Sequence, residues 1–157
     1  MAVAKSAIDR LLRAASQARA HAYAPYSGFH VGAAVLADGR VYAAPNVENS
    51  SFPLSVCAER NAVAAAVAAG AHRIEAVAVV GGNARPTPPC GGCRQVLAEF
   101  APPGAPVVYA SAAGDRVSTT LGALLPAAFG PSNLTGEAGS TDSRAARAPG
   151  RRRRSRR

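Results

Sequence analysis

The sequence predicts an α/β protein with a mixed sheet of roughly five strands and helices covering both faces of the sheet. Three observations predict this fold class. Helix-like segments alternate with short apolar segments along residues 4–125. Asp38-Gly39 lies between two apolar runs and is a hairpin signal, which requires an antiparallel pair. Residues 74–80 form a nearly continuous apolar run, the pattern of a strand that is buried on both faces.

The first elements are predicted as follows. Residues 4–21 place apolar side chains on one helical face and arginines on the other, which predicts an amphipathic helix. Two strands, over 29–36 and 40–44, then flank the hairpin turn. Gly32 lies inside the first of these strands, which indicates that another part of the chain approaches its backbone closely.

The rest of the body repeats the alternation of helices and strands. An alanine-rich stretch from Cys57 to Ala69 predicts the second helix, with Ser55 as its N-cap and Gly70 just beyond its end. The third helix is predicted from Cys90 to about Phe100. The remaining predicted elements are strands over 74–80, 106–111 and 117–120 and a helical turn over 121–125.

Charge is unevenly distributed along the chain, whose formal net charge is +9. Residues 131–157 contain eight arginines and two acidic residues, whereas residues 1–130 carry 10 basic and 7 acidic side chains. We therefore predict one folded domain over 1–130 and a disordered, arginine-rich tail over 131–157. The body lacks the basic cluster that is typical of a nucleic-acid-binding face.

Two features of the sequence bear on its cellular compartment. The first 22 residues carry charges and no long apolar stretch, so no signal peptide is predicted, and no run of 18 apolar residues is available to span a membrane. Three cysteines cannot all form disulfides within one chain. A cytoplasmic protein with reduced thiols is predicted.

The three cysteines lie in two short motifs whose chemistry fits a catalytic metal. The ligand candidates are Cys57, Cys90 and Cys93. Three thiolates fill three of the four tetrahedral positions around Zn²⁺ and leave the fourth for water. Glu59 follows the first thiol by two residues and can carry protons to and from that water. Both motifs begin predicted helices, where free N–H groups and the helix dipole stabilise thiolates.

A metal ligand two residues before a glutamate, followed later by Pro-Cys-x-x-Cys, resembles the zinc-dependent nucleobase deaminases. Over about residues 26–130 the chain is similar to the three-cysteine branch, the small homotetrameric cytidine deaminases. The resemblance implies a three-layer α/β/α cytidine-deaminase-like fold with a bound Zn²⁺. It implies hydrolytic deamination of cytidine and 2′-deoxycytidine to uridine and 2′-deoxyuridine, with release of ammonia, in pyrimidine salvage. Glu59 would be the catalytic proton carrier.

The resemblance also assigns residues to the nucleoside. The implied substrate contacts are Phe29, Asn46, Glu48, Phe52, Ala58 and Phe129. Asn46 and Glu48 would hold the ribose, with Glu48 at the 3′-hydroxyl, and Phe29 would pack on the base. Phe129 would reach the site of a neighbouring subunit, so that the active sites of a homotetramer are shared.

Three thiolates on one Zn²⁺ leave a net negative charge that opposes the formation of hydroxide from water. A nearby cation would offset this charge. The arginines that follow the motifs, Arg60 and Arg94, are predicted to do so.

Two other functions stay open at this point. A blasticidin-type antibiotic deaminase shares the zinc motif, although residues 46–49 favour a cytidine deaminase. A zinc-binding nucleic-acid interaction module would instead use the arginine-rich tail to bind phosphates. His30, Pro45 and Phe52 depart from the usual family pattern, which affects the details of sugar binding rather than the reaction.

Overall fold

The computed structural model describes residues 3–82 and 84–135, and it contains each predicted element within two residues of its predicted bounds. In chain order the elements are α1 (Lys5–Arg19), β1 (Val31–Ala37), β2 (Arg40–Pro45), the 3-10 helix η1 (Phe52–Leu54), α2 (Ala58–Ala68), β3 (Ile74–Gly81), α3 (Gly91–Phe100), β4 (Pro106–Ala110), β5 (Arg116–Thr120), α4 (Leu121–Leu124) and α5 (Pro131–Thr135). The alternation read from the sequence is therefore the order observed.

The five strands form one mixed sheet in the order β2-β1-β3-β4-β5. Strand β1 pairs antiparallel with β2 and β3, β3 pairs parallel with β4, and β4 pairs antiparallel with β5. The hairpin between β1 and β2 turns at Asp38 and Gly39, whose φ angles of 49° and 74° are both positive, as a type I′ turn requires. The predicted mixed, five-stranded sheet is confirmed.

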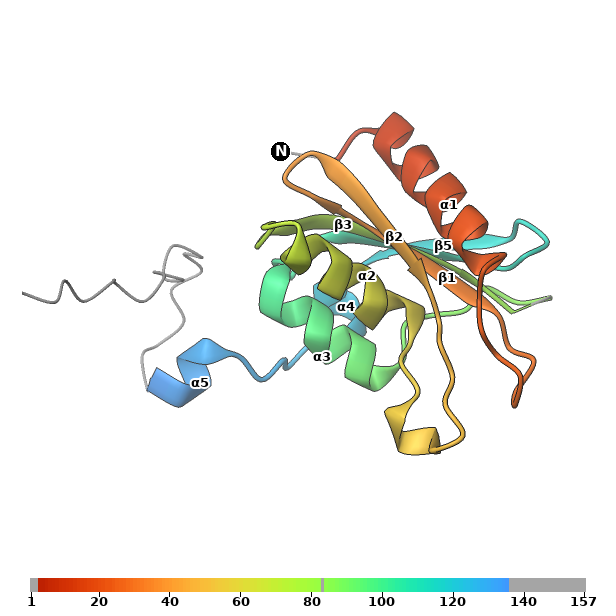
Figure 1. The fold of residues 1–157 in the computed structure, drawn as a ribbon. Coiled ribbons are helices and arrows are strands. Elements are labelled where there is room, and N and C mark those ends of the chain that lie inside the picture. The colour runs from red at the N-terminus through yellow and green to blue at the C-terminus, as the bar shows by residue number, and fades with distance from the viewer. Residues whose placement is uncertain (1–2, 83, 136–157) are drawn as a thin grey trace, which may run out of the picture.

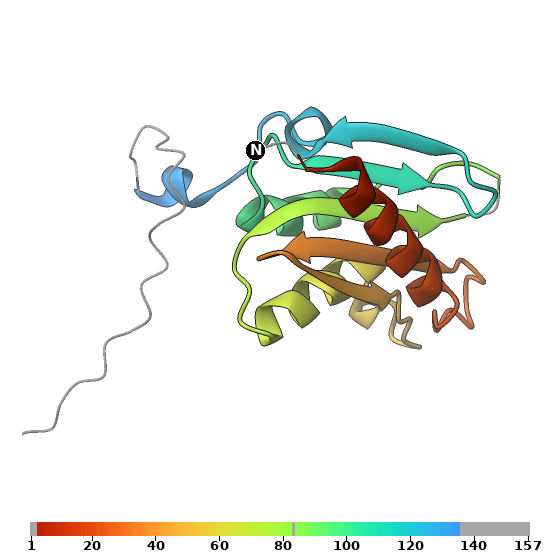
Figure 2. The same cartoon turned by 90° about the horizontal axis from the view of Figure 1, so that it is seen from above.

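Alternating side chains of the central strands build two cores, one on each face of the sheet. Val35 and Val77 belong to the core that packs under α2 and α3, whereas Leu36 and Ala76 belong to the core under α1. Figures 1 and 2 show α1 alone on one face and α2, α3 and α4 on the other. The arrangement is the predicted three-layer α/β/α fold, and it brings the N-termini of α2 and α3 side by side.

Gly32 is the point where α1 lies directly on the sheet. A Cβ atom at this position would be 2.0 Å from the carbonyl oxygen of Ala15 and 2.4 Å from the backbone nitrogen of Arg19. Both obstacles are backbone atoms of α1, so no side-chain rotation can relieve the clash. The close backbone approach predicted at this glycine is confirmed.

Gly32→Ala is expected to destabilise the protein by about 1–3 kcal/mol, because α1 must move away from the sheet to admit one methyl group. The midpoint of urea unfolding measures this loss. Gly104→Ala is the matched control, since a Cβ at Gly104 would meet nothing within 4 Å. Equal unfolding midpoints for the two variants would contradict the close contact between α1 and β1.

Two local features differ from the predictions. Ser55 is not the N-cap of α2: that position is Cys57, and Ser55 Oγ accepts a hydrogen bond from the backbone N–H of Asn49 at 3.0 Å. Helix α5 falls inside the predicted disordered tail, so residues 131–135 are helical. Residues 136–157, which include all eight arginines of that tail, lie outside the described residues, and the domain boundary at residue 130 stays a prediction.

Within the residues that the structure describes, no helix combines the length and the apolar character that a bilayer crossing requires.

Candidate active site

The three cysteines converge where α2 and α3 begin. Cys57 and Cys90 are the N-cap residues of these helices, and Cys93 lies in the first turn of α3. Their Sγ atoms all lie within 4.8 Å of one another, and those of Cys57 and Cys90 are 3.9 Å apart. A tetrahedral zinc with Zn–S bonds of about 2.3 Å separates its sulfur ligands by about 3.8 Å. The donor set and its spacing therefore fit Zn²⁺.

The sulfur cluster also carries the charge that a metal site needs. The pKa of Cys57 is lowered to about 6, chiefly by a hydrogen bond from the Cys93 thiol and further by Cys90 and the positive charge of Arg60, against the opposing effect of burial. The pKa of Cys93 is raised, because its proton is held by Cys57 and its sulfur is buried. A thiolate is thus already favoured at Cys57, the form in which cysteine binds metals.

Glu59 places a carboxyl group beside this cluster. Its side chain is only 5% exposed. Burial raises the pKa of Glu59, and the negative charge of Cys57 raises it further, while a hydrogen bond from the Cys93 thiol acts in the opposite direction. A buried carboxyl group whose pKa is raised in this way is suited both to accept and to donate protons in a reaction.

A short bridged segment joins the end of β2 to the metal motif. Val47 exchanges backbone hydrogen bonds of 3.0 and 2.9 Å with Val56, and it forms a further isolated bridge with Tyr23. Asn61, on α2, donates a hydrogen bond of 2.9 Å from its side chain to the carbonyl of Pro45. These contacts hold the residues that follow β2 next to the start of α2.

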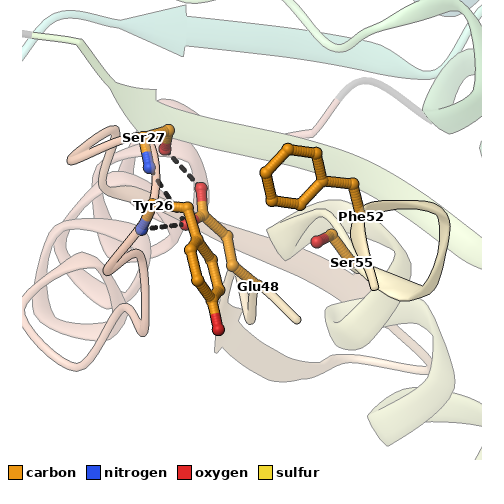
Figure 3. Close-up of a pocket in the computed structure, with 5 residues that line it drawn as sticks. All are labelled: Tyr26, Ser27, Glu48, Phe52 and Ser55. Carbon is orange, nitrogen blue, oxygen red and sulfur yellow. Dashed lines mark hydrogen bonds between the residues drawn. The ribbon is translucent and has the colours of Figure 1, made fainter. Parts of the chain in front are cut away.

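A pocket of about 300 Å³ lies along this bridged segment (Figure 3). Its lining residues are Tyr26, Ser27, Glu48, Phe52 and Ser55. The rings of Tyr26 and Phe52 contact each other with their centroids 5.7 Å apart. The volume lies at the lower end of the range for small-molecule sites, which are usually apolar with a few fixed polar groups.

Glu48 is the charged group of this pocket. Its Oε2 accepts hydrogen bonds from the backbone N–H groups of Tyr26 at 3.0 Å and Ser27 at 3.2 Å, and its Oε1 accepts one from the Ser27 hydroxyl. The Ser27 hydroxyl is the main cause that lowers the pKa of Glu48, and the charge of His30 contributes. The pocket therefore contains an ionised acceptor in a fixed orientation.

Comparison with known proteins identifies the family. Residues 5–110 match the model of the cytidine and deoxycytidylate deaminase zinc-binding region. The chain belongs to this deaminase family. A cytidine deaminase of Sporosarcina psychrophila is 44% identical over 129 residues, which cover 82% of this chain and 95% of the relative. One from Halalkalibacterium halodurans is 48% identical over 120 residues, which cover 76% and 91%.

A solved structure of the same kind confirms the fold of this deaminase family member. The crystal structure of cytidine deaminase from Burkholderia pseudomallei superposes with a TM-score of 0.74 at 47% identity, covering 81% of this chain and all of that one. The predicted family is thus confirmed, and so is the predicted zinc cofactor, for which the clustered cysteines are the candidate ligands. The two alternative functions gain no support from these relatives.

The structure brings some predicted substrate residues of the deaminase into the pocket and places others around it. Glu48 and Phe52 line the pocket. Phe29 is 46% exposed and its ring lies against Gly82. Asn46 uses its side chain on the backbone, donating to the carbonyl of Phe29 and accepting from the N–H of Val31, both at 2.9 Å. The ribose contact assigned to Asn46 stays a prediction.

The remaining predicted residues lie farther from the pocket lining. Ala58 is fully buried, and the substrate contact assigned to it stays a prediction. Phe129 is 59% exposed, and its carbonyl accepts a hydrogen bond of 2.7 Å from Gln95. Arg94 donates to the carbonyls of Pro89 at 2.8 Å and Leu124 at 2.9 Å, which fixes the loop before Cys90. Its role in offsetting the thiolate charge also stays a prediction.

Sequence reasoning missed four residues of this site. Tyr26, Ser27 and Ser55 line the pocket, and Asn61 ties α2 to β2. One signal for the first two was present: a turn before a strand leaves backbone N–H groups unpaired, and an acidic residue such as Glu48 is a natural acceptor for them. Their partner lies 22 and 21 residues away in the sequence, so the pairing itself depends on the fold.

Proposed function

We propose that this protein is a zinc-dependent deaminase that hydrolyses cytidine and 2′-deoxycytidine to uridine and 2′-deoxyuridine with release of ammonia, a reaction of pyrimidine salvage. The observation that carries the proposal is the buried Glu59 carboxyl group beside three sulfur atoms spaced for zinc. The neighbouring pocket, with an oriented carboxylate and aromatic rings, supports a nucleoside as the substrate. The names of the relatives support the same substrate.

The roles of the protein groups follow from the chemistry of the reaction. Cys57, Cys90 and Cys93 would hold Zn²⁺, which when bound lowers the pKa of water to about 7 and so supplies hydroxide at neutral pH. Glu59 accepts the proton of the attacking water and delivers it to N3 of the cytosine ring as the oxygen adds to C4. Glu59 then moves the hydroxyl proton to the amino group, which leaves as ammonia.

The pocket would position the nucleoside for this attack. Glu48 can accept a hydrogen bond from a sugar hydroxyl, because it is ionised and lines the pocket. Phe52 and Phe29 offer exposed aromatic surface for the base or the sugar. Binding energy gained here would be used to orient C4 at the metal, which is how positioning lowers a reaction barrier.

Ammonia release tests this proposal directly. The purified protein is incubated with cytidine, 2′-deoxycytidine and blasticidin S in parallel, and its zinc content is measured. Release from both cytosine nucleosides by a protein with about one zinc per chain is expected. Ammonia release from blasticidin S alone would show that the antibiotic, and not a cytosine nucleoside, is the substrate. Stoichiometric zinc without any ammonia release would exclude the proposed reaction.

A homotetramer with shared active sites and a cytoplasmic location belong to the same proposal. Phe129 and Leu134 are 59% and 77% exposed; Phe129 comes just before α5 and Leu134 lies within it. Figure 1 shows α5 set apart from the body of the domain. Exposed apolar side chains of this kind are usual at contacts between subunits. Light scattering at micromolar concentration should give the mass of four chains.

The proposed cytoplasmic location rests on the three thiols. They must stay reduced to bind zinc, which a reducing compartment favours.

Arg60→Ala is expected to keep zinc and to lose about 10- to 100-fold in kcat, the usual cost of removing a group that tunes metal ligands. The reason is that the Arg60 charge acts on Cys57, so its loss leaves the excess negative charge of the thiolates uncompensated. Arg60→Lys keeps the charge and is the matched control. Full turnover in Arg60→Ala with zinc bound would show that Arg60 does not offset the charge of the thiolates.

A further inference from the structure

Ser27 connects the two parts of the chain that are expected to contact the nucleoside. Its Oγ accepts a hydrogen bond from the backbone N–H of Phe29 at 3.0 Å. The same hydroxyl donates to Oε1 of Glu48. A serine hydroxyl has a single donor hydrogen, so the bond from Phe29 and the bond to Glu48 together form one directed chain. Hydrogen bonds linked in this way polarise and strengthen one another.

The turn around Ser27 fixes the orientation of the Glu48 carboxylate. A carboxylate has about four acceptor positions. Three are filled by donors from one turn: the N–H groups of Tyr26 and Ser27 at Oε2 and the Ser27 hydroxyl at Oε1. About one position is left, and Figure 3 shows the carboxylate between this turn and the open side of the pocket near Phe52.

Phe29 is fixed from two further sides. The Asn46 side chain accepts from the N–H of Val31 and donates to the carbonyl of Phe29, so it holds the chain on either side of His30. Behind the ring lies Gly82, where a Cβ atom would already be within 3.7 Å of Cε2 of Phe29. The N–H group of Phe29 is held in addition by Ser27.

We propose that Ser27 is a positioning residue for nucleoside binding, which fixes the Glu48 carboxylate and the Phe29 backbone through one hydroxyl group. The inference rests on the proposed function, because it assumes a nucleoside in this pocket. Ser27 itself acts through Glu48, so its effect should be on the affinity for the substrate and small on the chemical step. The side chain is exposed, which leaves room for a larger residue at this position.

The groups around Glu48 also define an expected pH dependence. The polar and charged neighbours that face it are Ser27 and the backbone of Tyr26 from the turn, with His30 before β1. The Ser27 hydroxyl lowers the pKa of Glu48, so removing it raises that pKa toward its ordinary value. Because the protonated carboxyl is a poorer acceptor for a sugar hydroxyl, KM should begin to rise at a higher pH on acidification when the hydroxyl is absent.

The test compares Ser27→Val with Ser27→Thr, two side chains of the same shape of which only threonine has a hydroxyl. In Ser27→Val, KM for cytidine is expected to rise about 10-fold, as for the loss of a hydrogen bond to a charged group, while kcat stays within about threefold. When the pH is lowered from about 6 to 4, the KM of this variant should begin to rise at a higher pH than the KM of the wild type. Ser27→Thr should restore both properties. Thermal unfolding of both variants checks that the fold is kept.

A double-mutant cycle with Glu48→Gln tests whether Ser27 acts through Glu48. In that background the effect of Ser27→Val on kcat/KM should fall well below the roughly tenfold change expected with Glu48 present, because the carboxylate is gone and only the bond from the Phe29 N–H is still lost. Equal KM values for the Val and Thr variants, or an undiminished effect in the Glu48→Gln background, would overturn the inference. A wild-type protein that releases no ammonia from cytidine would instead overturn the proposed function, so the two failures are distinct.

Discussion

Glu59→Gln is expected to keep its zinc and its fold and to lose at least about 10³-fold in kcat for cytidine. Glutamine has the same shape, so the 5% exposed side chain can be replaced without opening a cavity. It has no titratable proton, however, and so cannot carry one from water to N3 and then to the leaving amino group. Ammonia release measures the loss, and metal analysis together with calorimetric binding of cytidine shows that the site is otherwise intact.

Glu99→Gln provides the control for this experiment. Glu99 is an exposed carboxylate on α3, so the same chemical change occurs outside the sulfur cluster and should leave kcat within about twofold. A Glu59→Gln variant with more than a tenth of the normal turnover would place the proton transfer on another group. Burial beside the thiols is what distinguishes Glu59 from Glu99, so that burial would then not explain the proton transfer.

The elements of this fold could be predicted from the sequence because their signals are local. The Asp38-Gly39 pair specifies a turn by its own φ angles, and the apolar run that begins at Ile74 specifies a strand buried on both faces. Gly32 indicated a close approach, although not that α1 makes it. The metal motif was predictable for a related reason, since the ligand pair Cys90 and Cys93 and the pair Cys57 and Glu59 are each two or three residues apart.

The contacts that organise the pocket could not be predicted in this way, because each joins residues far apart in the chain. Ser27 and Glu48 are separated by 21 residues, and Asn61 contacts Pro45 across 16. The N-cap of α2 shows a second limit. Serine is a preferred N-cap residue because its oxygen can bond to the first N–H groups of a helix. Here that position is occupied by Cys57, whose sulfur faces the other thiols, and Ser55 bonds to Asn49 instead.

Cys93→Ala is expected to cost the protein both its zinc and its activity. Among the described residues, the three cysteines are the group of candidate ligands that the fold brings together, and Cys93 is the one that is fully buried. Structural zinc sites of four ligands bind with about 10–16 kcal/mol, so losing one ligand should weaken zinc binding by about 10²- to 10³-fold. Turnover of cytidine should fall by at least the same factor. Both the turnover and the zinc content are measured after dialysis.

The effect of Cys93→Ala on packing must be distinguished from its effect on metal binding, because the deleted sulfur is also part of the core. Val107→Ala removes buried volume from the core on the same face of the sheet without touching a ligand, so it should lower thermal stability while keeping zinc and kcat. Added zinc should raise the unfolding temperature of the wild type and of Val107→Ala but hardly that of Cys93→Ala, since only a ligand that binds the folded state stabilises it. Full zinc content in Cys93→Ala would show that the metal is held by other groups, and the role of Glu59, which rests on its place beside these sulfurs, would lose its basis.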